Sequence, residues 1–283
     1  MPMRPKTALL GAAACGLMLV VVWFAAFHIA FLGHLDQSIF RQFGGLRAHP
    51  RISGIAGRFV APFDPNPYVY LVLLPLVVAL LRGRPRVVLA VGAIVLGANM
   101  TTEILKHVIG DPRAGAVFAD GFWSTPLHAW PSGHSTAAMS LALASVLAAP
   151  ARLRPAVAAV GASVAIAVGY SVVETGMHYP SDVLGGFLVA TIWTLFAVAA
   201  IVAAERWRPT TRGAGSRVSV AAALGAPGAV LLAAGVLGTI LVAAHPHDVF
   251  DYARAHEAFV AGAAAIAALS LALSTGVVLS VRR

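Results

Sequence analysis

Three polar segments separate long apolar runs of the sequence, and each carries side chains suited to chemistry on a phosphate group. Lys106 and Arg113 lie at and just beyond the end of one apolar run. The sequence Pro-Ser-Gly-His at 131–134 opens the next run, and His178 and Asp182 stand between two later ones. Two cations, two histidines and a carboxylate therefore recur where apolar segments begin or end.

These residue types suit phosphoryl transfer, in which positioning and electrostatics supply most of the catalysis. Lys106 and Arg113 would provide positive charge for the phosphate oxygens. Ser132 and Gly133 would open a helix, and the free N–H groups and positive dipole end of a helix N-terminus bind anions. The sequence thus predicts a phosphate site formed by two cations and a helix end.

The two histidines fit complementary roles in such a site. His178 can attack phosphorus if a carboxylate orients its ring, and Asp182 follows four residues later. His134, at the mouth of another helix, can protonate the leaving oxygen as a general acid. We therefore interpret His178, Asp182 and His134 as the catalytic residues.

The composition is that of an integral membrane protein. Of 283 residues, 59% are hydrophobic and 11% are charged, against about 25% charged in an ordinary globular chain. A soluble enzyme, a disordered chain and a secreted disulfide scaffold are excluded, the last also because Cys15 is the single cysteine. The net charge of +9 lies in short clusters between apolar runs rather than in one patch, so we predict no nucleic-acid partner.

Long apolar runs predict an all-α, polytopic membrane helical bundle, because a span needs about 20 mostly apolar residues. We expect a six-span core over 1–204, a cytoplasmic linker over 205–217 and a two-span extension over 218–283. The eight predicted spans lie at 8–32, 66–81, 87–106, 133–149, 156–173, 183–204, 218–244 and 258–280.

The segment 33–65 is the longest predicted outer connection. Its Leu35, Ile39, Phe43 and Leu46 recur at helical spacing. Such a helix could lie in the headgroup plane or could cap the bundle. The pattern does not choose between these two interpretations.

Charge predicts the orientation of the protein in a cell membrane. Arginine clusters at 82–86, 152–154 and 206–217, together with the basic residues near both ends of the chain, fall on one side of the predicted spans. The positive-inside rule makes this side cytoplasmic, with both termini inside. The three polar segments then share the extracytoplasmic face.

At these residues the chain resembles the type 2 phosphatidic acid phosphatase superfamily of membrane lipid phosphatases. The superfamily patterns are K-x6-R-P, P-S-G-H and S-R-x5-H-x3-D. The first is matched by Lys106 and Arg113, and the second is matched completely at 131–134. The third is matched by Ser171, His178 and Asp182. All three occur in order and at compatible spacing.

The resemblance implies an integral membrane phosphatase that hydrolyses a lipid phosphate or diphosphate at the outer leaflet. It implies a phosphohistidine on His178 with Asp182 as its partner and acid catalysis by His134. It also implies that no metal or cofactor is needed. The phosphate-binding residues that it implies are Lys106, Arg113, Ser132, Gly133 and Ser171.

Two positions depart from the superfamily patterns. Ala114 replaces a proline, and Val172 replaces the arginine of the third pattern. A charged hydrogen bond to phosphate contributes about 1.5–3 kcal/mol, which corresponds to roughly tenfold to hundredfold in rate. A working enzyme would then need another cation, and the candidates on the outer side are Arg41, Arg47, Arg51, Arg58 and Arg254.

Alternative functions follow from the same features. A phosphohistidine can pass its phosphoryl group to another lipid or sugar, which would make the protein a phosphotransferase. The replacement at Val172 favours a non-catalytic, lipid-binding pseudoenzyme. A transporter is disfavoured because neither inverted repeats nor polar residues at the middle of the membrane are evident.

Overall fold

The protein folds into a bundle of long helices, shown here by a computed structural model that describes residues 4–110, 129–209, 219–244 and 246–281. No strand occurs in those residues, and the predicted all-α bundle is confirmed. The long helices are α1 (Pro5–His28), α4 (Pro65–Leu81), α5 (Pro85–Ile109), α6 (Gly133–Ala148), α7 (Arg154–Glu174), α8 (Pro180–Trp207), α9 (Val220–Ala244) and α11 (Glu257–Ser280).

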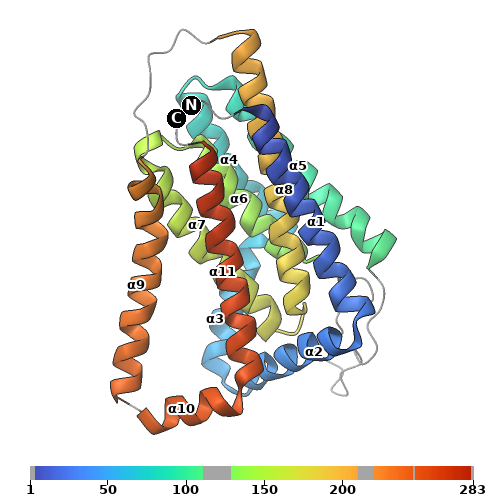
Figure 1. Cartoon of the computed structure of the whole chain (residues 1–283), viewed down its shortest axis with the longest axis vertical. Helices are drawn as coiled ribbons and strands as arrows, with labels where there is room; N and C mark the ends of the chain where they lie inside the picture. Colours follow the sequence, from blue (N-terminus) through green and yellow to red (C-terminus); the bar gives the residue numbers. More distant parts are fainter. Residues whose placement is uncertain (1–3, 111–128, 210–218, 245, 282–283) are drawn as a thin grey trace.

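Two of the shorter helices, α2 and α10, lie across one end of the bundle. Figure 1 shows α2 and α10 at the end opposite to the one where α1 begins and α11 finishes. The domain boundaries predicted at 204 and 217 stay predictions, although α8 itself continues to Trp207. The short elements are α2 (Ala30–Gly44), η1 (Gly45–Ala48), α3 (Pro50–Val60), η2 (Ala61–Phe63), η3 (Ala151–Leu153) and α10 (Pro246–Ala255).

The eight predicted spans need correction in three places. Within the described residues, six helices are long and apolar enough to cross a membrane alone: α1, α5, α7, α8, α9 and α11. The span predicted at 66–81 is one arm of a pair, 50–63 and 65–81, bent by 66°. The span predicted at 133–149 is the 16-residue helix α6, whose surface is mostly buried by neighbouring helices, so its length need not match the bilayer.

The predicted first span, 8–32, is wrong at its end. Helix α1 stops at His28, and Ile29 is extended, with φ −108° and ψ 102°. The chain breaks there because α2 turns across the bundle and buries Ile39, Phe40 and Phe43. Helix α2 packs on α7, α8 and α11, so it caps the bundle, as one of the two sequence interpretations expected.

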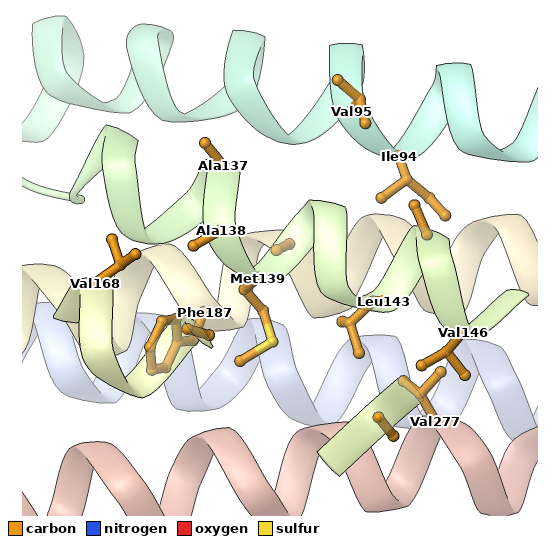
Figure 2. Packing of buried hydrophobic residues seen from close by; sticks show 14 of the residues in the cluster. Ile94, Val95, Ala137, Ala138, Met139, Leu143, Val146, Val168, Phe187 and Val277 are labelled. Carbon is orange, nitrogen blue, oxygen red and sulfur yellow. The ribbon is translucent and has the colours of Figure 1, made fainter. Parts of the chain in front are cut away.

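Helix α6 forms the centre of the bundle, in contact with α4, α5, α7 and α8. Met139 and Leu143 of α6 are fully buried and lie near Phe187 of α8 (Figure 2). Most of α9 is exposed, and in Figure 1 it stands at the edge of the molecule, beyond α7 and α11. The core therefore encloses the helix that begins with the Pro-Ser-Gly-His segment.

Three arginines lie at the end of the bundle away from α2: Arg82, Arg86 and Arg154. Arg82 donates to the carbonyl oxygen of Ala148, where α6 finishes, at 2.5 Å. Arg86 pairs with Glu205 at 2.7 Å, and Arg154 donates to the carbonyl oxygen at the end of α11. These contacts cap helix C-termini with positive charge, which the helix dipole favours.

The N-termini of α6 and α8 meet at the other end, where a glycine permits a close approach. The N–H of Ser132 donates to the carbonyl oxygen of Asp182 at 2.9 Å. A Cβ at Gly186 would stand 2.7 Å from the carbonyl oxygen of Ser132 and 2.9 Å from the backbone nitrogen of Thr136. Because both are backbone atoms, they cannot move aside as a flexible side chain could.

We expect Gly186→Ala to destabilise the protein, because overpacking of a tight interior costs about 1–3 kcal/mol. The measurement is thermal unfolding of the purified protein in detergent. The matched control is Gly228→Ala on α9, where a Cβ would meet no described atom within 4 Å. Equal melting temperatures for both variants would contradict the close approach.

Candidate active site

His178 lies in the tight turn between α7 and α8. Gly176 has φ +82°, a conformation that favours glycine, and the N–H groups of Met177 and His178 both donate to the carbonyl oxygen of Val172. His178 is 5% exposed. These two hydrogen bonds to α7 therefore hold the backbone of the turn at Met177 and His178 in place.

Asp182 lies in the first turn of α8, and the pairing predicted from the i, i+4 spacing is present. Its Oδ2 is 3.4 Å from Nδ1 of His178 and accepts the backbone N–H of Tyr179 at 2.8 Å. Within the described residues, Nδ1 makes no hydrogen bond of standard geometry. The carboxylate thus faces Nδ1, which leaves Nε2 as the nitrogen available for attack.

A second buried carboxylate, on helix α2, holds the start of α8 in place. Asp36 of α2 accepts the backbone N–H of Ser181 at 3.0 Å and its hydroxyl at 2.7 Å. Asp36 is 7% exposed. Sequence reasoning missed this contact, because Asp36 stands among polar residues of an amphipathic helix and lies 145 positions from its partner.

His134 faces His178 across the site. Ser132 is the N-cap of α6 and accepts the N–H of Ser135 at 3.3 Å, so His134 is the second residue of the helix. The ring centroids of His134 and His178 are 6.4 Å apart, in an edge-to-face arrangement. The helix N-terminus thus delivers one predicted catalytic histidine beside the other.

Lys106 brings positive charge to the same point from α5. Its Nζ pairs with Oε1 of Glu103 at 2.7 Å. A Cβ at Gly133 would stand 3.3 Å from this Nζ, so the lysine lies against the first residue of α6. The ammonium group and the α6 N-terminus together form an anion-binding corner.

The remaining predicted site residues are placed differently. Ser132 and Asp182 are buried and do not line the cavity described below. Ser171 is 6% exposed on α7, and its carbonyl oxygen accepts the hydroxyl of Thr175 at 2.7 Å. Arg113 falls in the segment 111–128, outside the described residues. No group of three or more His, Cys, Asp or Glu able to hold a metal occurs in the part of the chain that the structure describes.

An apolar cavity of about 720 Å³ leads to the two histidines. Its lining runs along α4 from Pro65 to Leu76, about 16 Å at 1.5 Å per residue. Lys106, His134 and His178 line it near the start of α4, and the rest is almost entirely apolar. Between α4 and α5 the lining residues Val69, Leu73, Leu96 and Met100 are 50–65% exposed, so the cavity opens sideways.

Among the candidate arginines, Arg47 contacts the His178 turn. It donates through Nε to the carbonyl oxygen of Glu174, and its guanidinium packs against Gly176 and over the ring of Phe40, 5.6 Å from the centroid. Burial lowers the pKa of Arg47 from its ordinary value, and the Glu174 carboxylate partly offsets this effect. The guanidinium of Arg47 therefore lies in a partly desolvated position against Gly176, which precedes His178 by two positions in the sequence.

The other four candidate arginines, all in the described residues, are exposed: Arg41, Arg51, Arg58 and Arg254. Val172, where the superfamily has arginine, is fully buried in α7. The sequence could not select Arg47, because its contact with the His178 turn joins residues 127 positions apart.

Asp64 is a further residue that sequence reasoning missed. Its Oδ1 lies 3.0 Å from Nε2 of His134. No motif contains Asp64, and its separation of 70 residues from His134 has no periodic meaning. The single available signal was an acidic residue directly before Pro65, a common position for a helix start.

Comparisons with known proteins agree with this architecture. Residues 87–207 match the family model of the PAP2 superfamily, and this range contains all the predicted site residues. The fold is similar to a transmembrane PAP2-type phosphatidylglycerolphosphate phosphatase from Bacillus subtilis, with a TM-score of 0.55 and 20% identity. That match covers 71% of this chain and 98% of the other. A search of curated proteins found no match.

The resemblance inferred from the three motifs is thereby confirmed. The apolar helices and the fold similarity also make the chain a multi-pass membrane protein. Residues 87–207 are similar to the PAP2 superfamily, and the chain has the fold of a transmembrane PAP2-type phosphatase.

Proposed function

We propose that the protein hydrolyses a lipid phosphate or diphosphate at the outer leaflet through a phosphohistidine intermediate. The observation that carries this proposal is the placement of His134, His178 and Lys106 along one apolar, laterally open cavity. Such a cavity suits a molecule with a hydrocarbon chain and an anionic head, because apolar burial holds the chain while cations hold the head.

In the first chemical step, Nε2 of His178 attacks phosphorus and the bond to the leaving oxygen breaks. Asp182 faces Nδ1 of the same ring and stabilises the positive charge that develops on it. A near-attack geometry places phosphorus about 3–3.5 Å from the nucleophile. With ring centroids 6.4 Å apart, a phosphoryl group held there also lies beside His134.

His134 gives its proton to the leaving oxygen, and positioned proton transfer of this kind contributes roughly 10²–10⁴-fold. In the second step, water attacks the phosphohistidine while His134 takes a proton from it, so phosphate is released and both histidines return to their starting states. Lys106 and the N–H groups at the start of α6 hold the phosphate oxygens during both steps.

The leaflet assignment follows from the charge distribution. The arginine-rich connections lie at the end of the bundle opposite to the histidines, and positive loops stay in the cytoplasm. The proposed site is then extracytoplasmic and both termini are cytoplasmic.

We expect a membrane-impermeant thiol reagent added to intact cells to label His49→Cys but not Arg152→Cys. Both positions are exposed and lie at opposite ends of the bundle. The experiment requires a Cys15→Ser background, since Cys15 is the single cysteine. Labelling of Arg152→Cys alone would invert the protein in the membrane and move the site to the inner leaflet.

We expect His178→Ala to abolish both phosphate release and an acid-labile phosphoenzyme, because it removes the nucleophile. Activity of the unmodified protein on purified lipid phosphates should persist in EDTA. His49→Ala, an exposed histidine at the same end, is the control and should retain activity. An active His178→Ala together with loss of activity in EDTA would contradict the phosphohistidine mechanism.

Arg47 should supply the positive charge that Val172 cannot. We expect Arg47→Ala to lower kcat/KM about tenfold to hundredfold, Arg47→Lys to lower it less, and the exposed control Arg41→Ala to leave it unchanged. Phosphate release is the measurement, with detergent melting temperatures to detect unfolding. An inactive natural protein that gains activity through Val172→Arg would instead identify a pseudoenzyme.

A further inference from the structure

The carboxylate of Asp64 contacts the proposed general acid directly. Asp64 lies where η2 passes into α4, and its Oδ1 is 3.0 Å from Nε2 of His134. The His134 side chain is 15% exposed and that of Asp64 is 52% exposed. The pair therefore joins the starts of α4 and α6 at the polar end of the cavity, which Pro65 and Gly133 line.

The sequence after Asp64 explains why its carboxylate is available for this contact. Asp64 is the N-cap of α4, a position where an aspartate side chain usually accepts a backbone N–H from the second or third helical residue. Pro67, the third helical residue, has no N–H, and no cap hydrogen bond from the Asp64 side chain occurs among the described residues. The carboxylate is thus directed to His134 rather than to its own helix.

Packing one turn further along fixes the register of the two helices. The hydroxyl of Tyr68 lies 2.8 Å from Oγ of Ser140, in a contact that is fully buried between α4 and α6. Phe63 packs beside Tyr68, with ring centroids 6.3 Å apart. In the sequence, Asp64 lies between Phe63 and Tyr68. The packing of these two aromatic residues therefore holds the backbone of Asp64 where its carboxylate reaches His134.

The other charged or titratable groups around His134 come from α5 and from the turn before α8. Burial of the His134 ring opposes a positive charge on it, as do His178 and Lys106, and Glu103 is already paired with Lys106. Asp64 is the carboxylate in hydrogen-bond contact with the ring. An imidazolium at this position is therefore favoured chiefly by Asp64, since an opposite charge at this distance stabilises the protonated form.

We propose that Asp64 is a positioning residue for His134, an inference that rests on the proposed phosphatase function. Asp64 orients the ring and stabilises its protonated form, which partly offsets the effect of burial, until the substrate is cleaved. The proton then passes from His134 to the leaving oxygen as its bond to phosphorus breaks and His178 takes the phosphoryl group. In the second step the attacking water returns a proton to His134, and Asp64 stabilises the imidazolium again.

The test compares substrates that differ in their need for a proton. In Asp64→Asn, turnover of a lipid monophosphate should fall at least about tenfold, as part of the roughly 10²–10⁴-fold from proton transfer. Turnover of the matching diphosphate should fall less than about threefold, because its phosphate leaving group needs little protonation. Asp64→Glu should recover part of the monophosphate activity, and the exposed control Asp251→Asn should leave both activities unchanged.

A second measurement reports on the pair without turnover. Diethyl pyrocarbonate modifies unprotonated imidazole, and peptide mass spectrometry follows His134 alone. Its modification should begin at lower pH in Asp64→Asn than in the unmodified protein, because the imidazolium has lost its counter-charge. An unchanged pH dependence would overturn the proposal.

Two kinetic outcomes would also overturn it and have different meanings. Equal losses on monophosphate and diphosphate would reduce Asp64 to a structural contact. No turnover of either lipid by the unmodified protein would refute the phosphatase function and, with it, the catalytic role of Asp64. The chemical-modification result would then still show whether Asp64 controls the protonation of His134.

Discussion

The site depends on the junction between the first turns of α6 and α8. There the N–H of Ser132 donates to the carbonyl oxygen of Asp182, and Gly186 lets the two backbones approach. Backbone groups inside an apolar bundle must be paired, since an unsatisfied one costs several kcal/mol in hydrocarbon. The same hydrogen bond that satisfies this requirement brings together the two segments that carry His134 and His178.

Carboxylates provide the second organising constraint. Asp36 holds the start of α8, Asp182 faces His178, Glu103 pairs with Lys106, and Asp64 contacts His134. Each fixes a cationic, histidine or helix-terminal group before any phosphate arrives. Preorganised groups of this kind cost little reorganisation during reaction, which is how electrostatic catalysis gains most of its effect. The four carboxylates come from four elements, so the site is assembled only by the complete bundle.

The cavity extends from the polar residues Lys106, His134 and His178 to the exposed apolar side chains of α4 and α5. Its apolar wall follows α4 and α5 and opens sideways through exposed side chains such as Leu73 and Leu96, whereas its polar end is closed by α6 and by the His178 turn. A ligand with an apolar chain can lie along the wall without desolvating polar atoms. For the proposed lipid substrate, the same arrangement would give an anionic head its counter-charges in a region of low dielectric, where they act most strongly.

The sequence by itself determined the membrane class, the apolar helices, the resemblance to the superfamily and the pairing of His178 with Asp182, because composition, periodicity and spacing along one chain are local properties. It did not determine the break at Ile29 or the contacts of Asp36, Arg47 and Asp64. These contacts join residues 70 to 145 positions apart. Such pairs carry no periodic signal, and they exist only because helix packing brings the ends of separate helices to one place.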